Sequence, residues 1–426
     1  MYSEKELQKR LYVSNYDQWS DLVNKKFLSE RKLNVQIIEN GIILPAKDLG
    51  RAVYGGGVFS KEGEFIAGFF RKKPPKNTVF GVQGAYEIEE LYESDEEVIF
   101  GGALISLFGH FILESLGRMW YILKNPGDKR KIIFLLVKEE QEWFYQFFKL
   151  LDIDINRIEI LKKPTHYRKI IIPDESIHSW YDYTEEYLVP YNYIRDKIKV
   201  SDIKKLYLTR SKVHLKGREI DRLNGNTYLC NEEYFEQFYK GKGYKVISPE
   251  KFPVEEQISM VAGADEVVST LGSLSHWALF CKSKTKFTML ARVDDDTLYP
   301  QCLINEAKNI DWRIIDVSMN FLPLQNRGTG VCLLGETKYW KRFVEEFYNE
   351  KIFSEYWREK IDEYVSNWCY YCSIDNAAPL LTRVIKRTYD LAIKNNMSSK
   401  QDEMMKILLQ RTNFLQGQIQ SINNSK

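Results

Sequence analysis

Residues 244–290 decide the fold, and they read YKVISPEKFPVEEQISMVAGADEVVSTLGSLSHWALFCKSKTKFTML. Three short apolar runs, at residues 244–249, 266–270 and 285–290, alternate there with two runs of helical spacing. Such alternation is typical of a parallel sheet covered by helices on both faces. The sequence therefore predicts an α/β unit, with ligand-binding residues at the carboxyl ends of its strands.

The alternation continues upstream of this stretch. Residues 204–210 predict a further strand and residues 231–243 a helix that ends at glycine. The continuous apolar run at residues 131–137 predicts a parallel strand that is buried on both faces. Residues 108–123 carry apolar side chains at helical spacing and predict a buried helix, whereas the glycine-separated segments of residues 33–100 favour antiparallel strands.

These patterns predict an α/β protein of two Rossmann-like lobes. Residues 1–200 are expected to form the first lobe, β-rich over residues 33–100 and α/β from about residue 101. Residues 201–325 are expected to form the second lobe, and residues 326–426 a helical C-terminal extension. The extension is expected to pack back across both lobes or to form a homodimer.

Composition narrows the class of protein. Lys and Arg total 61 against 59 for Asp and Glu, so no strong field selects nucleic acid as a partner. The N-terminus MYSEKELQKRLY lacks the layout of a secretory signal, and the apolar stretch Val98–Leu113 is too short and too polar to span a bilayer. We expect a cytoplasmic protein, and peripheral association with the inner face of the membrane is compatible with these features. Cys369 and Cys372 form a single C-x-x-C, which favours a half-buried aromatic segment over a redox or zinc site.

A candidate acid–base pair lies in the segment GHFILESLGRMW. On a helix, His110 and Glu114 would share one face, with Arg118 one turn further on. A histidine that is oriented by a carboxylate can accept a proton from a hydroxyl near neutral pH. A structural ion pair is the alternative interpretation.

A basic loop follows the strand at residues 204–210. Arg210 and Lys212 would lie at the carboxyl edge of the sheet, where a diphosphate needs cationic neutralisation, and Arg218 and Arg222 continue the loop. An ordinary solvated loop is the alternative. Glu232 begins the next helix, where its carboxylate either caps the helix or accepts a hydrogen bond from a ribose or sugar hydroxyl.

A glycine turn follows the strand at residues 266–270. Gly272 and Ser273 would begin a helix whose amides can receive phosphate oxygens. His276 would contact the nucleotide or pack between the lobes. The aspartates 294–296 could hold a metal ion, but their place after the last strand of the unit favours a surface loop.

The order of these motifs resembles glycosyltransferase family 61 over about Val98 to Leu290. The matching motifs are G-H-x-x-x-E-x-x-x-R at residues 109–118, L-T-R-S-K at 208–212, N-E-x-x-[FL] at 231–235, E-x-Q at 255–257, A-D-x-[VI]-[VI] at 264–268 and L-G-S-L at 271–274. The family includes bacterial capsule and lipopolysaccharide transferases, plant xylan xylosyltransferases and animal transferases that add N-acetylglucosamine to proteins.

The resemblance implies a GT-B fold with two lobes facing a cleft, an inverting transfer from a nucleoside-diphosphate sugar to a hydroxyl of a glycan, and no essential metal or other cofactor. We expect His110 and Glu114 as the catalytic pair and Arg118 on the acceptor side. The expected donor-binding residues are Arg210, Lys212, Glu232, Gly272, Ser273 and His276. A noncatalytic sugar- or nucleotide-binding scaffold of a polysaccharide-assembly complex, and a transferase of polyol phosphate, are the rival hypotheses.

Overall fold

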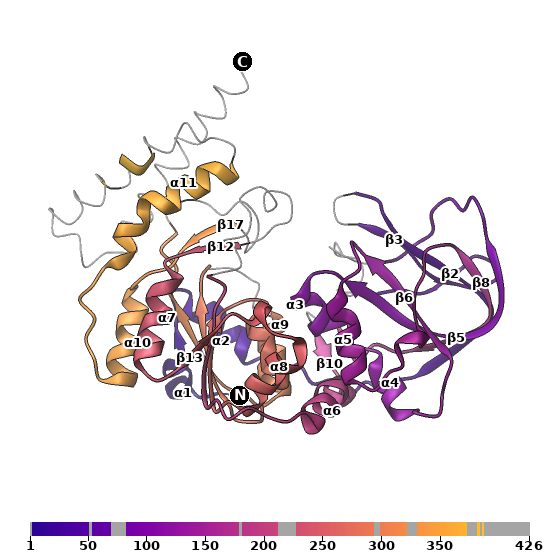
Figure 1. Cartoon of the computed structure of the whole chain (residues 1–426), viewed down its shortest axis with the longest axis horizontal. Helices are drawn as coiled ribbons and strands as arrows, with labels where there is room; N and C mark the ends of the chain where they lie inside the picture. Colours follow the sequence, from indigo (N-terminus) through magenta and orange to yellow (C-terminus); the bar gives the residue numbers. More distant parts are fainter. Residues whose placement is uncertain are drawn as a thin grey trace, which may run out of the picture.

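The computed structural model describes residues 2–50, 53–69, 82–178, 181–211, 227–293, 299–320, 322, 330–372, 381–383 and 386. In this part of the chain a seven-stranded sheet and a six-stranded sheet form the centres of two bodies, which Figure 1 shows side by side. Helices accompany both sheets. The predicted α/β class is confirmed.

The seven-stranded sheet of the first body is mixed. Its strands are β4 (Phe65–Ala67), β3 (Tyr54–Phe59), β2 (Val35–Asp48), β8 (Thr165–Pro173), β5 (Tyr92–Ile105), β6 (Lys131–Val137) and β7 (Ile158–Ile160), in that order. β2 pairs antiparallel with β3 and β8, whereas β5 pairs parallel with β8 and β6. The β-rich section expected over residues 33–100 is thus continuous with the parallel strands that follow it. Five of the seven side chains of β6 are buried, as its unbroken apolar run predicts.

The helix expected over residues 108–123 is broken. It consists of α3 (Phe108–His110), the π-helix η1 (Phe111–Ser115) and, after three residues outside any helix, α4 (Met119–Lys124). The apolar spacing was interpreted correctly as burial, because Phe111, Leu113 and Leu116 are fully buried. It did not reveal the change of hydrogen-bond pattern, since every residue of η1 is buried and burial on all sides does not distinguish one helix type from another. The first body also contains α5 (Glu142–Leu150) and η2 (Ile155–Arg157).

The six-stranded sheet of the second body is parallel throughout. Its strands are β1 (Leu11–Tyr12), β16 (Asp311–Asp316), β15 (Lys286–Ala291), β14 (Glu266–Thr270), β11 (Lys205–Leu208) and β13 (Lys245–Ile247), in that order. The first strand of the chain therefore lies in the second body, although residues 1–200 were expected to form the first lobe. Its two residues pair with Ile314 and Ile315, and a strand so short has no periodicity from which its place could be predicted.

Helices surround the second sheet and lead into the C-terminal extension. They are α1 (Glu4–Gln8), α2 (Tyr16–Val23), α7 (Glu232–Gly241), η5 (Pro249–Lys251), α8 (Val254–Gly263), η6 (Ser275–Phe280), α9 (Tyr299–Ala307), α10 (Lys338–Tyr348), η7 (Tyr356–Lys360) and α11 (Ile361–Tyr371). β12 (Thr227–Cys230) pairs parallel with β17 (Gly330–Leu333), and α11 packs against β17. Residues 387–426, the last part of the extension for which a homodimer contact is one of the two expectations, lie outside the described residues.

A connecting segment and a shared core join the two bodies. The segment contains β9 (Ile177–His178), β10 (Asp182–Tyr183), η3 (Glu185–Leu188) and α6 (Val189–Lys197). One hydrophobic cluster includes Phe111 of η1 and Trp277 of η6. The rings of Phe108 and Trp277 have centroids 5.2 Å apart, so α3 and η6 are in direct contact.

Two negative findings concern the part of the chain that the structure describes. No disulfide joins its cysteines, and Cys369 is buried while Cys372 is half-buried. No described helix is long and apolar enough to cross a membrane.

Candidate functional site

The predicted acid–base pair forms on the turn between α3 and η1. His110 Nδ1 lies 3.4 Å from Glu114 Oε2. The Glu114 side chain is 2% exposed and that of His110 is 27% exposed. A buried carboxylate thus lies behind an imidazole that solvent reaches, and such an arrangement can orient the ring and stabilise its protonated form. Short π-helical insertions occur frequently at functional sites.

Arg118 does not join this pair. Its Nη1 lies 2.9 Å from Glu175 Oε1, its Nε donates to the carbonyl of Pro173 at 2.8 Å, and its Nη2 donates to that of Gly68 at 3.0 Å. The prediction of a shared helical face assumed an unbroken α-helix, and the break at η1 removes that basis. Arg118 is buried and ties three segments of the first body together.

Two arginines lie at the carboxyl edge of the second sheet. Arg210 follows β11 by two residues, and Arg292 directly follows β15. Burial, and then the charge of Arg292, lower the pKa of Arg210, which places the two guanidinium groups within electrostatic reach of each other. Two arginine side chains therefore lie at this edge, and the carboxyl groups of Glu232 and Glu250 also act on Arg210.

Arg292 also supports the glycine turn after β14. Its Nη1 donates a hydrogen bond to the carbonyl of Leu271. Gly272 has φ +136°, a region that side chains rarely adopt, and a Cβ there would lie 2.9 Å from the same Nη1. A glycine at this position therefore lets the guanidinium pack directly against the turn.

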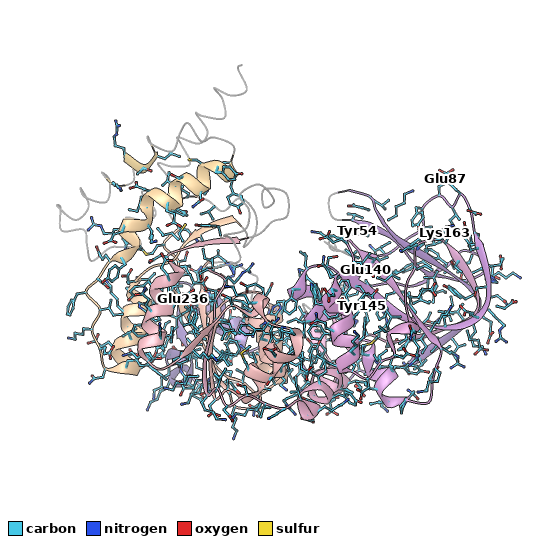
Figure 2. The ribbon with its side chains drawn as sticks, viewed as in Figure 1. Tyr54, Glu87, Glu140, Tyr145, Lys163 and Glu236 are labelled. Atoms are coloured by element: carbon cyan, nitrogen blue, oxygen red, sulfur yellow. The ribbon has the colours of Figure 1, made fainter. Side chains whose placement is uncertain are left out.

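Glu232 anchors the loop that carries Arg210. The carboxylate is fully buried and accepts a hydrogen bond from the backbone N–H of Arg210, with 3.1 Å from N to Oε2. Burial, and then the charge of Glu236, raise the pKa of Glu232 to about 8. Glu236, which Figure 2 labels on α7, accepts hydrogen bonds from the hydroxyls of Thr209 and Ser211. Two carboxyl groups of α7 thus hold the end of β11.

The predicted helix after the glycine turn is the six-residue 3-10 helix η6 rather than an α-helix. Ser275 Oγ donates to the carbonyl of Gly272 and lies 3.3 Å from the Gly272 amide, which itself donates to that oxygen. The side chain of Ser275 thereby closes the turn in place of a regular helical start. The Gly272 amide is therefore engaged within the turn, and the role predicted for Gly272 and Ser273 in receiving phosphate oxygens stays a prediction.

The glycine turn touches the segment that carries His110. A Cβ on Gly109 would lie 2.5 Å from Ser273 Oγ and 3.2 Å from Ser273 Cα. His276 Nδ1 lies 3.2 Å from the carbonyl oxygen of Gly109. Of the two roles predicted for His276, packing between the bodies is the one for which the structure shows a contact.

Some predicted residues lie outside the described part of the chain, namely Lys212, Arg218, Arg222 and aspartates 294–296. Among the described residues no group of three or more His, Cys, Asp or Glu side chains could hold a metal ion.

Arg292 was missed by the sequence analysis. It stands directly after a parallel strand, as Arg210 nearly does, and the rule that singled out Arg210 applies to it equally.

A parallel sheet with a cationic carboxyl edge and a glycine turn is typical of α/β proteins that bind phosphate-bearing ligands. The family model described as Glycosyltransferase 61 matches residues 108–288, from α3 into β15. This match confirms the resemblance that the motifs indicate, and it supports glycosyltransferase activity in general. No curated protein matches the sequence significantly.

Proposed function

We propose that the chain is an inverting, metal-independent glycosyltransferase of GT-B arrangement. It transfers a sugar from a nucleoside-diphosphate sugar to a hydroxyl of a glycan acceptor, of the capsule or lipopolysaccharide kind. One observation carries the proposal: the packing of Gly109 against Ser273 brings the turn of His110 next to the glycine turn that Arg292 supports. The candidate base thus lies next to the turn that Arg292 supports, and this contact between the bodies supports the proposal.

His110 acts as the general base in the proposed step. Its imidazole takes the proton of the acceptor hydroxyl, and the hydroxyl oxygen forms a bond to the anomeric carbon of the donor sugar. The bond from that carbon to the diphosphate oxygen breaks with inversion. Glu114, buried behind the ring at 3.4 Å, stabilises the imidazolium that results.

Arg210 and Arg292 stabilise the departing diphosphate. Charge-assisted hydrogen bonds from guanidinium to phosphate oxygens are roughly twice as strong as neutral ones. They supply the charge neutralisation that a divalent ion supplies in metal-dependent transferases. Glu232 contributes indirectly, because it fixes the backbone of Arg210.

The test is transfer from a panel of UDP-, GDP- and dTDP-sugars, with His110→Ala as the critical variant. We expect it to abolish transfer while calorimetry with the corresponding nucleoside diphosphate shows unchanged binding. His178→Ala is the matched control, since His178 also pairs with a carboxylate four residues on, at 3.0 Å from Asp182, and is similarly exposed. Substantial turnover by His110→Ala would contradict the assignment of the base.

The same assay separates the rival functions. Activity that survives a chelator supports metal independence, and activity that vanishes in EDTA and returns with manganese contradicts it. Nucleotide binding without any turnover would favour a noncatalytic scaffold, and a phosphodiester-linked polyol product would favour a phosphotransferase. Cell fractionation tests the proposed cytoplasmic location at the inner face of the membrane.

A further inference from the structure

Two tyrosines of the connecting segment lie directly behind the turn of His110. Tyr187 of η3 and Tyr191 of α6 are fully buried. Tyr187 donates its hydroxyl proton to the carbonyl of Leu113, with 3.1 Å between the oxygens, and Tyr191 donates to the carbonyl of Ile112. Both acceptors belong to the π-helix that carries Glu114.

These hydrogen bonds satisfy backbone groups at an irregular point of the chain. A π-helix shifts the backbone pairing by one residue, and carbonyls near such a shift need acceptable donors when no water reaches them. The surroundings are dry, because every residue of η1 is buried. The two hydroxyls therefore hold the backbone of the π-helix in one orientation, and with it the side chain of Glu114.

The tyrosines also reach the second body. Their own rings pack edge to face with centroids 5.3 Å apart, and the ring of Tyr191 packs in the same way on Phe280, at 5.5 Å. Phe280 ends η6, the 3-10 helix that begins just after the glycine turn. A continuous set of contacts thus runs from the backbone beneath Glu114 to the helix that follows Ser273.

We propose that Tyr187 and Tyr191 are positioning residues for the transfer reaction. They orient Glu114, and through it His110, relative to the glycine turn of the second body. The inference rests on the proposed function, since it assigns His110 as the base. The hydroxyls contact neither substrate in this proposal and act only through the π-helix.

The test uses Tyr187→Phe and Tyr191→Phe, which keep the rings and remove only the hydroxyls. Each variant is expected to lower kcat about tenfold, because misplacement of a reacting group acts on the chemical step. The donor KM and the affinity for the nucleoside diphosphate should stay at the wild-type values. Titration with that nucleotide counts the folded sites, and kcat is normalised to this count.

Tyr364→Phe is the matched control. Tyr364 is also fully buried, and its hydroxyl donates to the carbonyl of Leu322 at 3.3 Å and accepts from the N–H of the same residue at 3.0 Å. It lies in α11 of the C-terminal extension. Loss of this hydroxyl should lower the melting temperature at least as much as in the other two variants while the normalised kcat stays unchanged.

Three outcomes decide the inference. A normalised kcat that falls in the Tyr187 and Tyr191 variants alone supports it. An unchanged kcat in both, or an equal fall in Tyr364→Phe, would overturn it and leave the role of His110 intact. If wild-type protein binds nucleotide but transfers no sugar, the proposed function fails first, and hydrogen exchange of residues 111–115 still reports whether the hydroxyls hold the π-helix.

Discussion

Gly109→Ala tests the contact between the two bodies most directly. The added Cβ would lie 2.5 Å from Ser273 Oγ, 2.8 Å from its Cβ and 3.2 Å from its Cα. Because carbon atoms pack at about 3.5–4.0 Å, α3 and the glycine turn must separate by on the order of 1 Å. The backbone of Gly109 is helical, where alanine is favoured over glycine, so the strain falls on the contact and not on the helix.

A separation of this size should lower kcat by roughly 100-fold, because a displacement of about 1 Å between reacting groups has such an effect. The free energy of unfolding should fall by only about 1–3 kcal/mol, as for other overpacked sites. Donor affinity should be unchanged, because Arg210 and Arg292 both belong to the second body. The measurements are steady-state transfer kinetics, urea denaturation and calorimetry with the nucleoside diphosphate.

The double variant Gly109→Ala, Ser273→Gly is the compensating control. It removes Oγ and Cβ of Ser273, the two atoms closest to the new methyl group, and should recover much of the lost kcat. Ser273→Gly alone reports any contribution of the hydroxyl. A Gly109→Ala variant with wild-type kcat, or a double variant no faster than the single one, would refute the geometry from which the function is inferred.

Three further predictions concern buried charges. Arg292→Met should weaken nucleoside-diphosphate binding about 10- to 100-fold, which is the contribution of one charge-assisted hydrogen bond. An unchanged Kd in calorimetry would contradict the proposal that Arg292 binds the diphosphate. The pKa of Glu232 is raised from 4.5 to about 8, so the folded state binds this proton more tightly than the unfolded chain and stability declines as pH rises between those values. Glu232→Gln should therefore flatten the dependence of urea-denaturation stability on pH between about 5 and 8, and identical slopes for both proteins would count against the assignment. Arg118→Met removes the cation that pairs with the buried Glu175, and it should reduce the free energy of unfolding by about 3–5 kcal/mol with no change in acceptor KM. A raised acceptor KM at wild-type stability would instead support the predicted acceptor-side role of Arg118.

Long-range pairing limited what could be predicted of the fold. The apolar run of β6 and the alternation from β11 to β15 are local signals, and both led to the correct elements. The pairing of β1 with β16 joins residues about 300 positions apart, and nothing in the two residues of β1 indicates their partner. The strand order of the first sheet likewise places β8 between β2 and β5. This order depends on tertiary packing and not on a local sequence pattern.

The location of a candidate site residue was predictable where its position relative to a strand determines it. Arg210 was found because a residue after a parallel strand lies at the carboxyl edge of the sheet, and Arg292 obeys the same rule. Arg118 was predicted to lie on the helical face of His110 and Glu114 because of its spacing from them. The π-helix η1 interrupts that face, and the Arg118 side chain pairs with Glu175 instead. The support that Tyr187 and Tyr191 give to that turn comes from 70 or more residues away, and no local pattern indicates it.

Two glycine–arginine contacts among the described residues differ in the charges that surround the arginine. Gly102 and Gly272 both have positive φ, and a Cβ on either would lie within 3 Å of a guanidinium nitrogen, of Arg118 and of Arg292 respectively. Arg118 is neutralised by Glu175 at 2.9 Å, so its contact stabilises the first body. Arg292 lies directly after β15, and its charge acts on Arg210. Burial raises the pKa of Glu232 to about 8, and this weakens the negative charge that the carboxyl group places beside Arg210. In the proposed function, a diphosphate bound beside these guanidinium groups would relieve the repulsion between them, and the second body would favour the charged leaving group over a neutral sugar.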